Sequence, residues 1–353
     1  MFKKVFFVGI ALIMIGYGAI CRSEGIPLKI GMVSEGSIDD KSFNQGTWEG
    51  IQRAAEKFDL EIKYLKTNGN TEADYLKEIG NLHDAGYNMI FCPGFKMQTA
   101  VFQAQQKYPE IKFVQIDGKP HAGDFKPVIR KNTVAVIFAE HEAGFLAGIA
   151  AALQIKEGEV GFIGGMAVPE VQKYNWGFQQ GILYANQNLG TRINMKPDNV
   201  IYIGTYSDVA AGQLLAAQMF DKGVKVIFCA AGAVGMGAIN EAKTRANKGK
   251  RVWIVGVDRD QFDDGVYKST HSVILTSAIK RLDQVSFRII KSEKEGTFSG
   301  GEALTFDVKS EGVGIPVKNP SLGKEVRDKV TKILGKIKSG EIVVSSQQGA
   351  LIQ

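Results

Sequence analysis

The sequence contains two copies of one structural unit, and this internal repeat constrains the fold more than any other feature. Three segments of the first half recur in the same order in the second half: 44–51 at 175–182, 86–92 at 223–229, and 113–117 at 254–258. The offset grows slowly along the chain, as loop insertions between matched elements would produce. We therefore expect two similar lobes, with chance similarity of generic strand–helix units as the alternative.

Short β-branched runs alternate with amphipathic stretches from Leu28 onward. In the stretch 43–58, Trp48, Ile51 and Phe58 lie at helical spacing, which predicts a helix with one buried stripe. Strands are predicted between such helices at 29–33, 61–65, 88–92, 112–116, 134–138, 159–163, 200–203, 225–229 and 252–257. Continuous apolar strands separated by helices are typical of parallel sheets that are covered on both faces.

These patterns predict an α/β protein of two Rossmann-like lobes. The 353 residues suit two domains of about 150 residues each. We expect lobe 1 to comprise 28–138 and about 275–303, and lobe 2 to comprise 139–274 and about 304–353, because further elements follow the second repeat. The carboxyl ends of the strands in both lobes would then face a cleft, where small ligands bind.

The first twenty residues form a separate segment. Lys3 and Lys4 precede an uncharged run that ends at Ile20, which is short for a membrane span and typical of a secretory signal peptide (1–20). Cys21 follows immediately, so we expect it to carry a lipid anchor, although Ile20 departs from the Gly or Ala usually found before such a cysteine. Ordinary signal cleavage nearby is the alternative.

Composition and motifs argue against several functional classes. The formal charge of +6 comes from scattered basic residues, which gives little support to nucleic-acid binding. Cys92 and Cys229 lie in apolar runs and are expected to be buried thiols. The sequence has no phosphate-binding loop, no nucleophile elbow and no His-Glu-x-x-His zinc helix, and its four histidines are dispersed. We therefore expect no enzyme, no metal and no cofactor.

The loop before the first predicted helix carries the first candidate ligand-binding residues. Asp40 and Asn44 offer hydrogen-bonding groups and Phe43 offers a ring that can stack on a flat heterocycle. Simple N-capping of the helix by Asp40 or Ser42 is an equally weighted alternative. The second copy has three aromatic residues at the corresponding place, of which one or two could supply the opposite stacking face: Tyr174, Trp176 and Phe178.

Two aspartates end matched strands of the repeat. Asp117 and Asp258 each follow an apolar run, so each carboxylate should stand at the carboxyl edge of its sheet. A carboxylate there can accept two hydrogen bonds from adjacent hydroxyl groups, as on ribose. A turn or cap is the alternative role, and it is stronger for Asp117. Lys280 lies near another predicted strand end, where an exposed lysine is the usual outcome.

Four motifs lie downstream of Cys21: DKSFN at 40–44, GAVGMG at 232–237, GVD at 256–258 and SAIK at 277–280. In this combination they resemble the basic membrane protein family, the substrate-binding lipoproteins of ABC transporters, over nearly the whole mature chain. The resemblance implies a type I periplasmic-binding-protein fold, in which crossover strands join the lobes and a purine nucleoside lies between them.

The same resemblance implies a role for each matched residue. Phe43 and one aromatic of the pair Tyr174 and Trp176 would stack on the base. Asp40, Asn44 and Asp117 would read polar edges of the base or orient neighbouring side chains. Ribose hydroxyls would be held by Asp258, assisted by Lys280 and the backbone near Gly232.

The implied function is a non-enzymatic receptor. It would be exported, monomeric and anchored through Cys21 to the cell membrane, facing the periplasm. There it would capture inosine, guanosine or adenosine and deliver it to an ABC permease. The alternatives are a sugar or autoinducer receptor of the same fold, a nucleoside hydrolase or phosphorylase, and an exported adhesin or antigen without a transport role.

Overall fold

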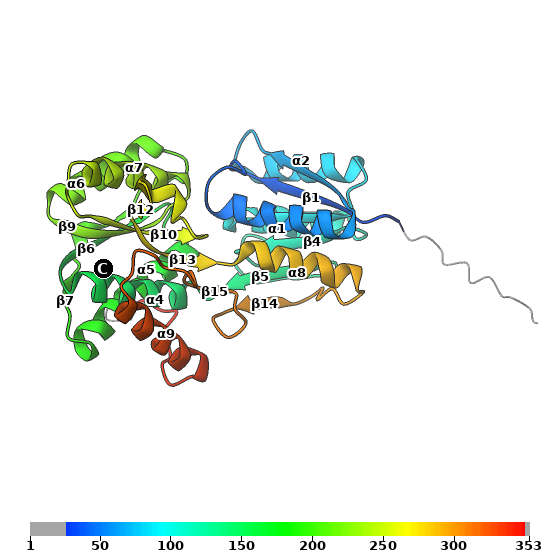
Figure 1. Ribbon diagram of the computed structural model, residues 1–353. Helices are drawn as coiled ribbons and strands as arrows, with labels where there is room; N and C mark the ends of the chain where they lie inside the picture. The colour runs from blue at the N-terminus through cyan, green and yellow to red at the C-terminus, as the bar shows by residue number, and fades with distance from the viewer. Residues whose placement is uncertain (1–25, 350–353) are drawn as a thin grey trace, which may run out of the picture.

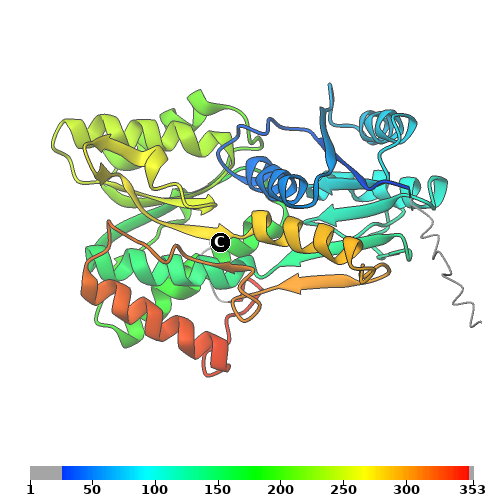
Figure 2. The same ribbon diagram turned by 45° about the vertical axis from the view of Figure 1, so that its right-hand side comes forward.

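The computed structural model describes residues 26–349. Two α/β lobes lie side by side and the chain passes between them (Figure 1). A view turned by 45° shows the same separation, with the chain passing between the lobes on one side of the molecule (Figure 2). The signal peptide and Cys21 predicted above lie outside the described residues.

The first lobe contains a six-stranded sheet in which the strand order is β14-β5-β4-β3-β1-β2 and every neighbouring pair is parallel. Its strands are β1 (Lys29–Ser34), β2 (Glu61–Lys66), β3 (Met89–Pro93), β4 (Lys112–Ile116), β5 (Thr133–Phe138) and β14 (Ala303–Phe306). Its helices are α1 (Phe43–Phe58), α2 (Glu72–Asp84), α3 (Gln98–Lys107) and α8 (Leu282–Lys294), preceded at α3 by a short 3₁₀ turn, η1 (Phe95–Met97).

The second lobe contains a seven-stranded sheet in the order β15-β13-β10-β9-β6-β7, with β8 also paired to β6. Its strands are β6 (Glu157–Gly164), β7 (Arg192–Asn194), β8 (Val200–Tyr202), β9 (Val224–Ala230), β10 (Trp253–Asp258), β13 (Ile274–Lys280) and β15 (Val313–Gly314). Its helices are α4 (Glu140–Ile155), α5 (Pro169–Asn188), α6 (Val209–Asp221), α7 (Ala233–Asn247) and α9 (Lys324–Ser339). Short elements complete it: η2 (Pro197–Asn199), η3 (Asp263–Gly265), and the hairpin of β11 (Val266–Lys268) and β12 (His271–Ser272).

The internal repeat occupies matching places in the two lobes. Helix α1 of the first copy corresponds to α5 of the second, β3 corresponds to β9, and β4 corresponds to β10. In each sheet the first strand of the lobe, β1 or β6, pairs with the repeated strand β3 or β9, which pairs in turn with β4 or β10. The two-lobed α/β fold predicted from the sequence is therefore confirmed.

Two strands belong to the other sheet from the one we expected. Residues 275–280, expected in lobe 1, form most of β13 and pair in parallel with β10 of the second sheet. Residues 304–306, expected in lobe 2, lie in β14 and pair with β5 of the first sheet. Strand β13 extends the edge left open by β10, the last repeated strand of its lobe, whereas β14 extends the edge left open by β5, and each pairing satisfies the backbone groups of that edge. The chain thus crosses between lobes after β5, after β13 and after β14.

Helices α4 and α5 cross at very short range, and glycines make this possible. A Cβ atom at Gly177 would collide with the carbonyl oxygen of His141, and one at Gly144 would collide with that of Tyr174. The close approach buries α4 on nearly every side. It also fixes the first residues of α4 and the middle of α5 relative to each other, next to the end of β13.

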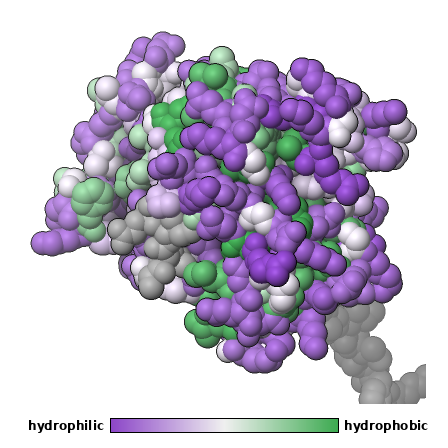
Figure 3. Space-filling model, turned by 90° about the vertical axis from the view of Figure 1, so that its left-hand side faces the viewer, coloured by the Kyte–Doolittle hydropathy of each residue, from purple (hydrophilic) through white to green (hydrophobic). Residues whose placement is uncertain are grey.

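Among the described residues, no helix is both long and apolar enough to cross a membrane. Seen from the outer end of the second lobe, the surface is mainly hydrophilic with scattered hydrophobic side chains (Figure 3). The exposed hydrophobic residues of this lobe include Leu183 and Leu214, which are 42% and 60% exposed. Single apolar side chains of this kind are normal on a protein surface.

Candidate functional site

Asp117 and Asp258 occupy equivalent positions directly after β4 and at the end of β10. Both are buried, at 7% exposure each. Both also have left-handed backbone conformations, with φ of 57° and 65°. Such φ values cost free energy for a non-glycine residue, although aspartate tolerates them better than most. Two buried carboxylates held in this conformation at matched strand ends mark the place where the lobes meet as a candidate functional site.

Lys280, at the end of β13, lies between the lobes as a buried cation. Its Nζ atom lies 2.6 Å from Asp117 Oδ2 and 3.0 Å from Glu140 Oε1, and its side chain is only 2% exposed. Lys173 approaches the other oxygen of Glu140 at 3.5 Å. One lysine on a crossover strand therefore connects a carboxylate of the first lobe to one at the beginning of α4.

Three aromatic rings surround the Lys280 ammonium group. Its Nζ atom lies 5.1 Å from the ring centroid of Phe138, 5.4 Å from that of Phe43 and 5.7 Å from that of Tyr174. These distances are within the range of cation–π attraction. The rings come from β5, α1 and α5, so the cation also holds aromatic side chains of both lobes around one point.

Asp258 makes hydrogen bonds toward both lobes. Its Oδ2 atom accepts a hydrogen bond from Ser42 Oγ of the first lobe, and its Oδ1 atom lies 3.4 Å from the Tyr174 hydroxyl group, which donates to it. The neighbouring Gln261 donates through Nε2 to the Lys41 carbonyl oxygen at 3.0 Å. The described conformation is thus one in which the lobes are in direct contact.

Burial and neighbouring charges perturb the ionisation of the site. Burial raises the pKa of Asp117 to about 6, against the opposing effect of the Lys280 charge. Burial also raises the pKa of Asp258, again opposed by Lys280. For Lys280 burial alone would lower the pKa, but the adjacent Asp117 and Glu140 carboxylates hold it well above its usual range. Lys280 is therefore charged at any physiological pH.

Asp40 and Asn44 use their polar atoms within the loop that begins α1. The Asp40 carboxylate accepts hydrogen bonds from the backbone N–H groups of Ser42, Asn44 and Gln45 at 2.9–3.1 Å, and from Asn44 Nδ2 at 2.8 Å. Asn44 Oδ1 accepts a hydrogen bond from Ser34 Oγ at 2.6 Å. In this structure Asp40 therefore caps the helix, as one of the two sequence interpretations held, and the loop positions Phe43 beside Lys280.

The three aromatic residues of α5 have different surroundings. Tyr174 is 3% exposed and contacts the Lys280 and Asp258 groups. Trp176 is half-buried and lies two residues further along, about 200° around the helix, so it does not join this cluster. Phe178 is fully buried and packs against Phe228 at 5.3 Å between ring centroids. Of these rings, only Tyr174 lies at the candidate site.

Gly232 precedes α7 in a left-handed conformation, with φ of 57°. A Cβ atom there would lie 3.3 Å from the carbonyl oxygen of Tyr206, tighter than most such contacts. Tyr206 follows β8, and burial raises the pKa of its phenol, with further contributions from the Asp117, Glu170 and Glu35 charges. Because Gly232 has no side chain, the Tyr206 loop can approach the amino end of α7.

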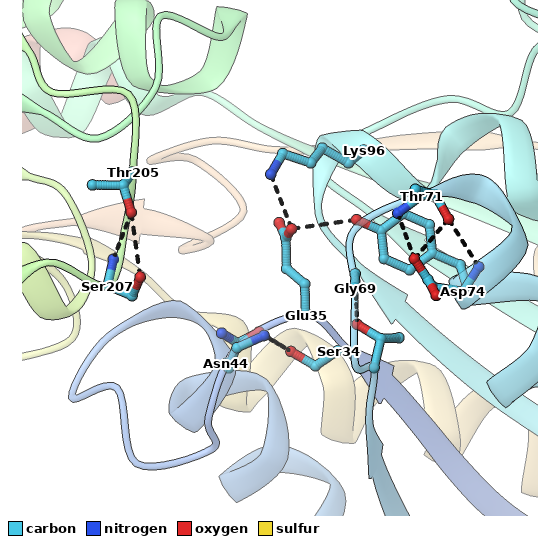
Figure 4. A network of polar contacts seen from close by, with 12 residues as sticks. Ser34, Glu35, Asn44, Gly69, Thr71, Asp74, Lys96, Thr205 and Ser207 are labelled. Atoms are coloured by element: carbon cyan, nitrogen blue, oxygen red, sulfur yellow. Dashed lines mark hydrogen bonds and ion pairs between the residues drawn. The ribbon is translucent and has the colours of Figure 1, made fainter.

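A polar network lies beside the site on the first lobe (Figure 4). Glu35 Oε2 accepts hydrogen bonds from Lys96 Nζ at 3.0 Å and from the Tyr75 hydroxyl group at 3.3 Å. At the other side of this view, Thr205 and Ser207 of the second lobe hydrogen-bond to each other. Figure 4 thus draws hydroxyl and charged groups of both lobes in the region of the loop that begins α1, where Asn44 lies.

Four residues at the site were missed by the sequence analysis: Ser42 as a donor to Asp258, Phe138, Glu140 and Tyr206. Phe138 ends a predicted strand and Glu140 lies two residues later, which is the signal that identified Asp117 and Asp258. This segment has no counterpart in the internal repeat, so the repeat does not single it out. Ser42 was considered only as a helix cap.

The chemistry of the site is that of recognition through hydrogen bonds, charge and aromatic surface. Within residues 26–349, no group of three or more His, Cys, Asp or Glu side chains is arranged to hold a metal ion. Burial raises the pKa of the Cys92 and Cys229 thiols, which are both fully enclosed. The Lys280 cation, several carboxyl groups and the rings of Phe43 and Tyr174 converge between the lobes, an arrangement suited to a small polar molecule with a flat apolar part.

Comparison with known proteins agrees with this geometry. A family model described as "ABC transporter substrate-binding protein PnrA-like" matches residues 28–348. The chain is 32% identical to the ABC transporter nucleoside-binding protein BmpA of Lactococcus lactis subsp. cremoris, over 96% of this chain and 97% of that protein. It is 34% identical to basic membrane protein A2 of Borrelia garinii subsp. bavariensis, over 91% and 89% of the two chains.

Among solved structures, the chain is similar in fold to an ABC transporter solute-binding protein of Aeropyrum pernix K1. The TM-score is 0.76 and the sequence identity 24%, with 92% of this chain and 95% of that chain covered. The fold and the family expected from the sequence motifs are therefore confirmed. This chain belongs to the Bmp family of ABC transporter substrate-binding proteins.

Proposed function

We propose that this protein is a receptor that captures purine nucleosides between its lobes and delivers them to an ABC permease. The observation that carries the proposal is the pairing of two buried, left-handed carboxylates, Asp117 and Asp258, around a buried Lys280 flanked by Phe43 and Tyr174. A nucleoside combines a flat base with a polar sugar, and this set of groups can bind both parts.

The base is assigned to the aromatic residues. Phe43 and Tyr174 come from opposite lobes and lie within 6 Å of the same ammonium group. Stacking on nucleobases is worth about 1–3 kcal/mol for each aromatic side chain. Closing the lobes would bring one ring from each side toward the base, so ligand binding and closure would stabilise each other.

The ribose is assigned to Asp258. Its two oxygens are satisfied by Ser42 and by a long bond from Tyr174. Adjacent ribose hydroxyl groups can replace these donors, and Lys280 supplies a charge beside them. Leaving a buried carboxylate without hydrogen-bond donors costs about 1–3 kcal/mol or more. A ligand that lacks the two adjacent ribose hydroxyl groups would therefore bind less well.

The cellular role follows from the family and from the first residues of the chain. We propose that the protein is exported, that Cys21 carries a lipid anchor, and that the mature protein works as a monomer on the outer side of the cell membrane without catalysing a reaction. A single acylated cysteine attaches a protein to a membrane and leaves the folded part in water.

The proposal is tested by titration calorimetry. Mature protein is unfolded and refolded to remove any ligand carried from the cell, and guanosine is titrated with ribose as the comparison. We expect saturable one-to-one binding of guanosine and none of ribose at the same concentrations. Absence of guanosine binding by protein with a native circular dichroism spectrum would contradict the proposal and favour a sugar ligand.

Asp258→Asn is the variant that tests the ribose assignment, because asparagine also tolerates the left-handed backbone of this position. Loss of the charge should weaken guanosine binding by about 1.5–3 kcal/mol, the usual value of a charged hydrogen bond. Asp263→Asn, at an exposed carboxylate of the same lobe, is the control and should bind like the wild type. Equal affinities of the two variants would contradict the assignment.

A further inference from the structure

Glu170 is a buried carboxyl group to which the site described so far gives no role. It is the second residue of α5 and is 9% exposed, and its Oε2 atom has no hydrogen-bond partner in the described part of the chain. Tyr174 follows one helical turn later and therefore lies on the same face of α5. A buried carboxyl oxygen without a partner is costly, so a donor or acceptor from a bound molecule is the natural partner for it.

Asp117 offers a second unpartnered oxygen from the opposite lobe. Its Oδ2 atom pairs with Lys280, while its Oδ1 atom is buried without a hydrogen-bond partner among the described residues. Burial, followed by the charges of Asp117 and Glu140, raises the pKa of Glu170 to about 8, and the charge of Lys280 opposes this rise. Glu170 and Asp117 thus lie close enough to influence each other across the boundary between the lobes.

We propose that Glu170 sets the base preference of the nucleoside site, accepting hydrogen bonds from guanine when it is a carboxylate and donating one to adenine when it is a carboxylic acid. The inference rests on the proposed function. Guanine presents N1–H and an amino group, two adjacent donors that suit a carboxylate. Adenine presents N1 as an acceptor beside its amino group, so it requires a donor at the same place. Hypoxanthine, with N1–H alone, should behave like guanine with one donor fewer.

Protonation of Glu170 then selects between the two bases in a defined pH range. With a pKa of about 8, roughly a tenth of Glu170 is ionised at pH 7.0 and roughly three quarters at pH 8.5. Three of the groups that face it keep one charge state over this range. Asp117, with a pKa of about 6, is ionised, Lys280 is charged, and the Tyr206 phenol is neutral because burial raises its pKa. Glu140 is held beside the Lys280 charge at 3.0 Å.

The test is to measure the dissociation constants of guanosine and adenosine by calorimetry between pH 7.0 and 8.5, below the pH at which guanine N1 itself loses its proton. The change in ionised fraction predicts that guanosine affinity rises up to about eightfold and adenosine affinity falls up to about fourfold. In Glu170→Gln both affinities should become independent of pH, because the amide can donate or accept by rotation. Glu241→Gln, on α7 of the same lobe, is the control and should keep the wild-type response.

The outcomes separate this inference from the proposed function. Two nucleosides that bind with the same pH dependence, or an unchanged pH dependence in a folded Glu170→Gln variant, would overturn the inference and leave nucleoside binding intact. No binding of either nucleoside to the wild type at any pH would overturn the proposed function and the inference together. Opposite pH trends that disappear only in Glu170→Gln would support the assignment.

Discussion

Replacing Lys280 by methionine should destabilise the unliganded protein strongly. The change removes the cation from a pocket in which the lysine side chain is 2% exposed, and it leaves two carboxylates, Asp117 and Glu140, buried beside an apolar side chain. Breaking a buried ion pair by removing one partner costs about 3–5 kcal/mol, because the remaining charge is uncompensated. We expect a loss of this size in the free energy of unfolding at pH 8, which is well above the pKa of about 6 that Asp117 has in the wild type.

The loss should shrink toward pH 5. Without the ammonium group the pKa of Asp117 will rise above its present value of about 6, so the carboxyl group becomes neutral in the folded variant as the pH falls. A neutral carboxyl group needs no counter-charge, and the variant then approaches the wild type. Equilibrium urea unfolding, followed by circular dichroism at both pH values, measures the difference in the free energy of unfolding between variant and wild type. Two-state behaviour is checked by whether the transitions seen with different probes coincide.

Lys324→Met is the matched control. Lys324 also lies 2.6 Å from a carboxylate, that of Asp328, but these side chains are 82% and 62% exposed. Exposed pairs typically contribute less than about 1 kcal/mol, so this variant should be close to the wild type. The double variant Lys280→Met with Asp117→Asn should recover part of the loss. A cost below about 1 kcal/mol for Lys280→Met, or full additivity in the double variant, would refute the reasoning.

Three further outcomes are expected. Phe43→Ala should weaken guanosine binding by about 1–3 kcal/mol in calorimetry, whereas an equal effect on any ribose binding would mean that Phe43 only shapes the loop. Because the pKa of Glu170 is raised, the folded protein holds a proton that the unfolded chain releases between about pH 4.5 and 8. Glu170→Gln should therefore unfold at a higher urea concentration than the wild type at pH 8 and lose this advantage at pH 4.5. A difference that stays constant with pH would contradict this prediction. Gly177→Ala should lower the free energy of unfolding by about 1–3 kcal/mol, because the added Cβ collides with the His141 carbonyl oxygen. Gly335→Ala in α9, where a Cβ meets open space, should be neutral or stabilising in the same urea unfolding experiment.

Much of the site could be predicted because strand ends are visible in a sequence. Asp117 follows the mainly apolar strand β4 and Asp258 ends the apolar strand β10, and in parallel sheets such ends share one edge. The structure brings both together with Phe43, Tyr174 and Lys280. Their roles toward a ligand remain predictions, since the proteins compared with this chain bear on its family and fold.

Other parts could not be predicted because they depend on contacts between distant segments. The choice of Tyr174 over Trp176 follows from the rotation of α5 against α4, which the glycine contacts set. The exchange of β13 and β14 between lobes follows from which sheet edge was open, and no local pattern records that. The ion pair of Lys280 with Asp117 joins residues 163 positions apart in the chain.

The sequence by itself determined the two-lobed α/β fold, the matched units of the repeat and the family, because apolar periodicity and short motifs are local properties of the chain. Only the tertiary structure decided that Lys280 is a buried cation and not an exposed lysine. It also decided that Asp40 caps a helix while Glu170 Oε2 is buried without a hydrogen-bond partner among residues 26–349. Whether such a side chain is buried, and which group it pairs with, depends on what surrounds it between the lobes. That space exists only after both sheets have formed and the crossover strands have brought their carboxyl edges together.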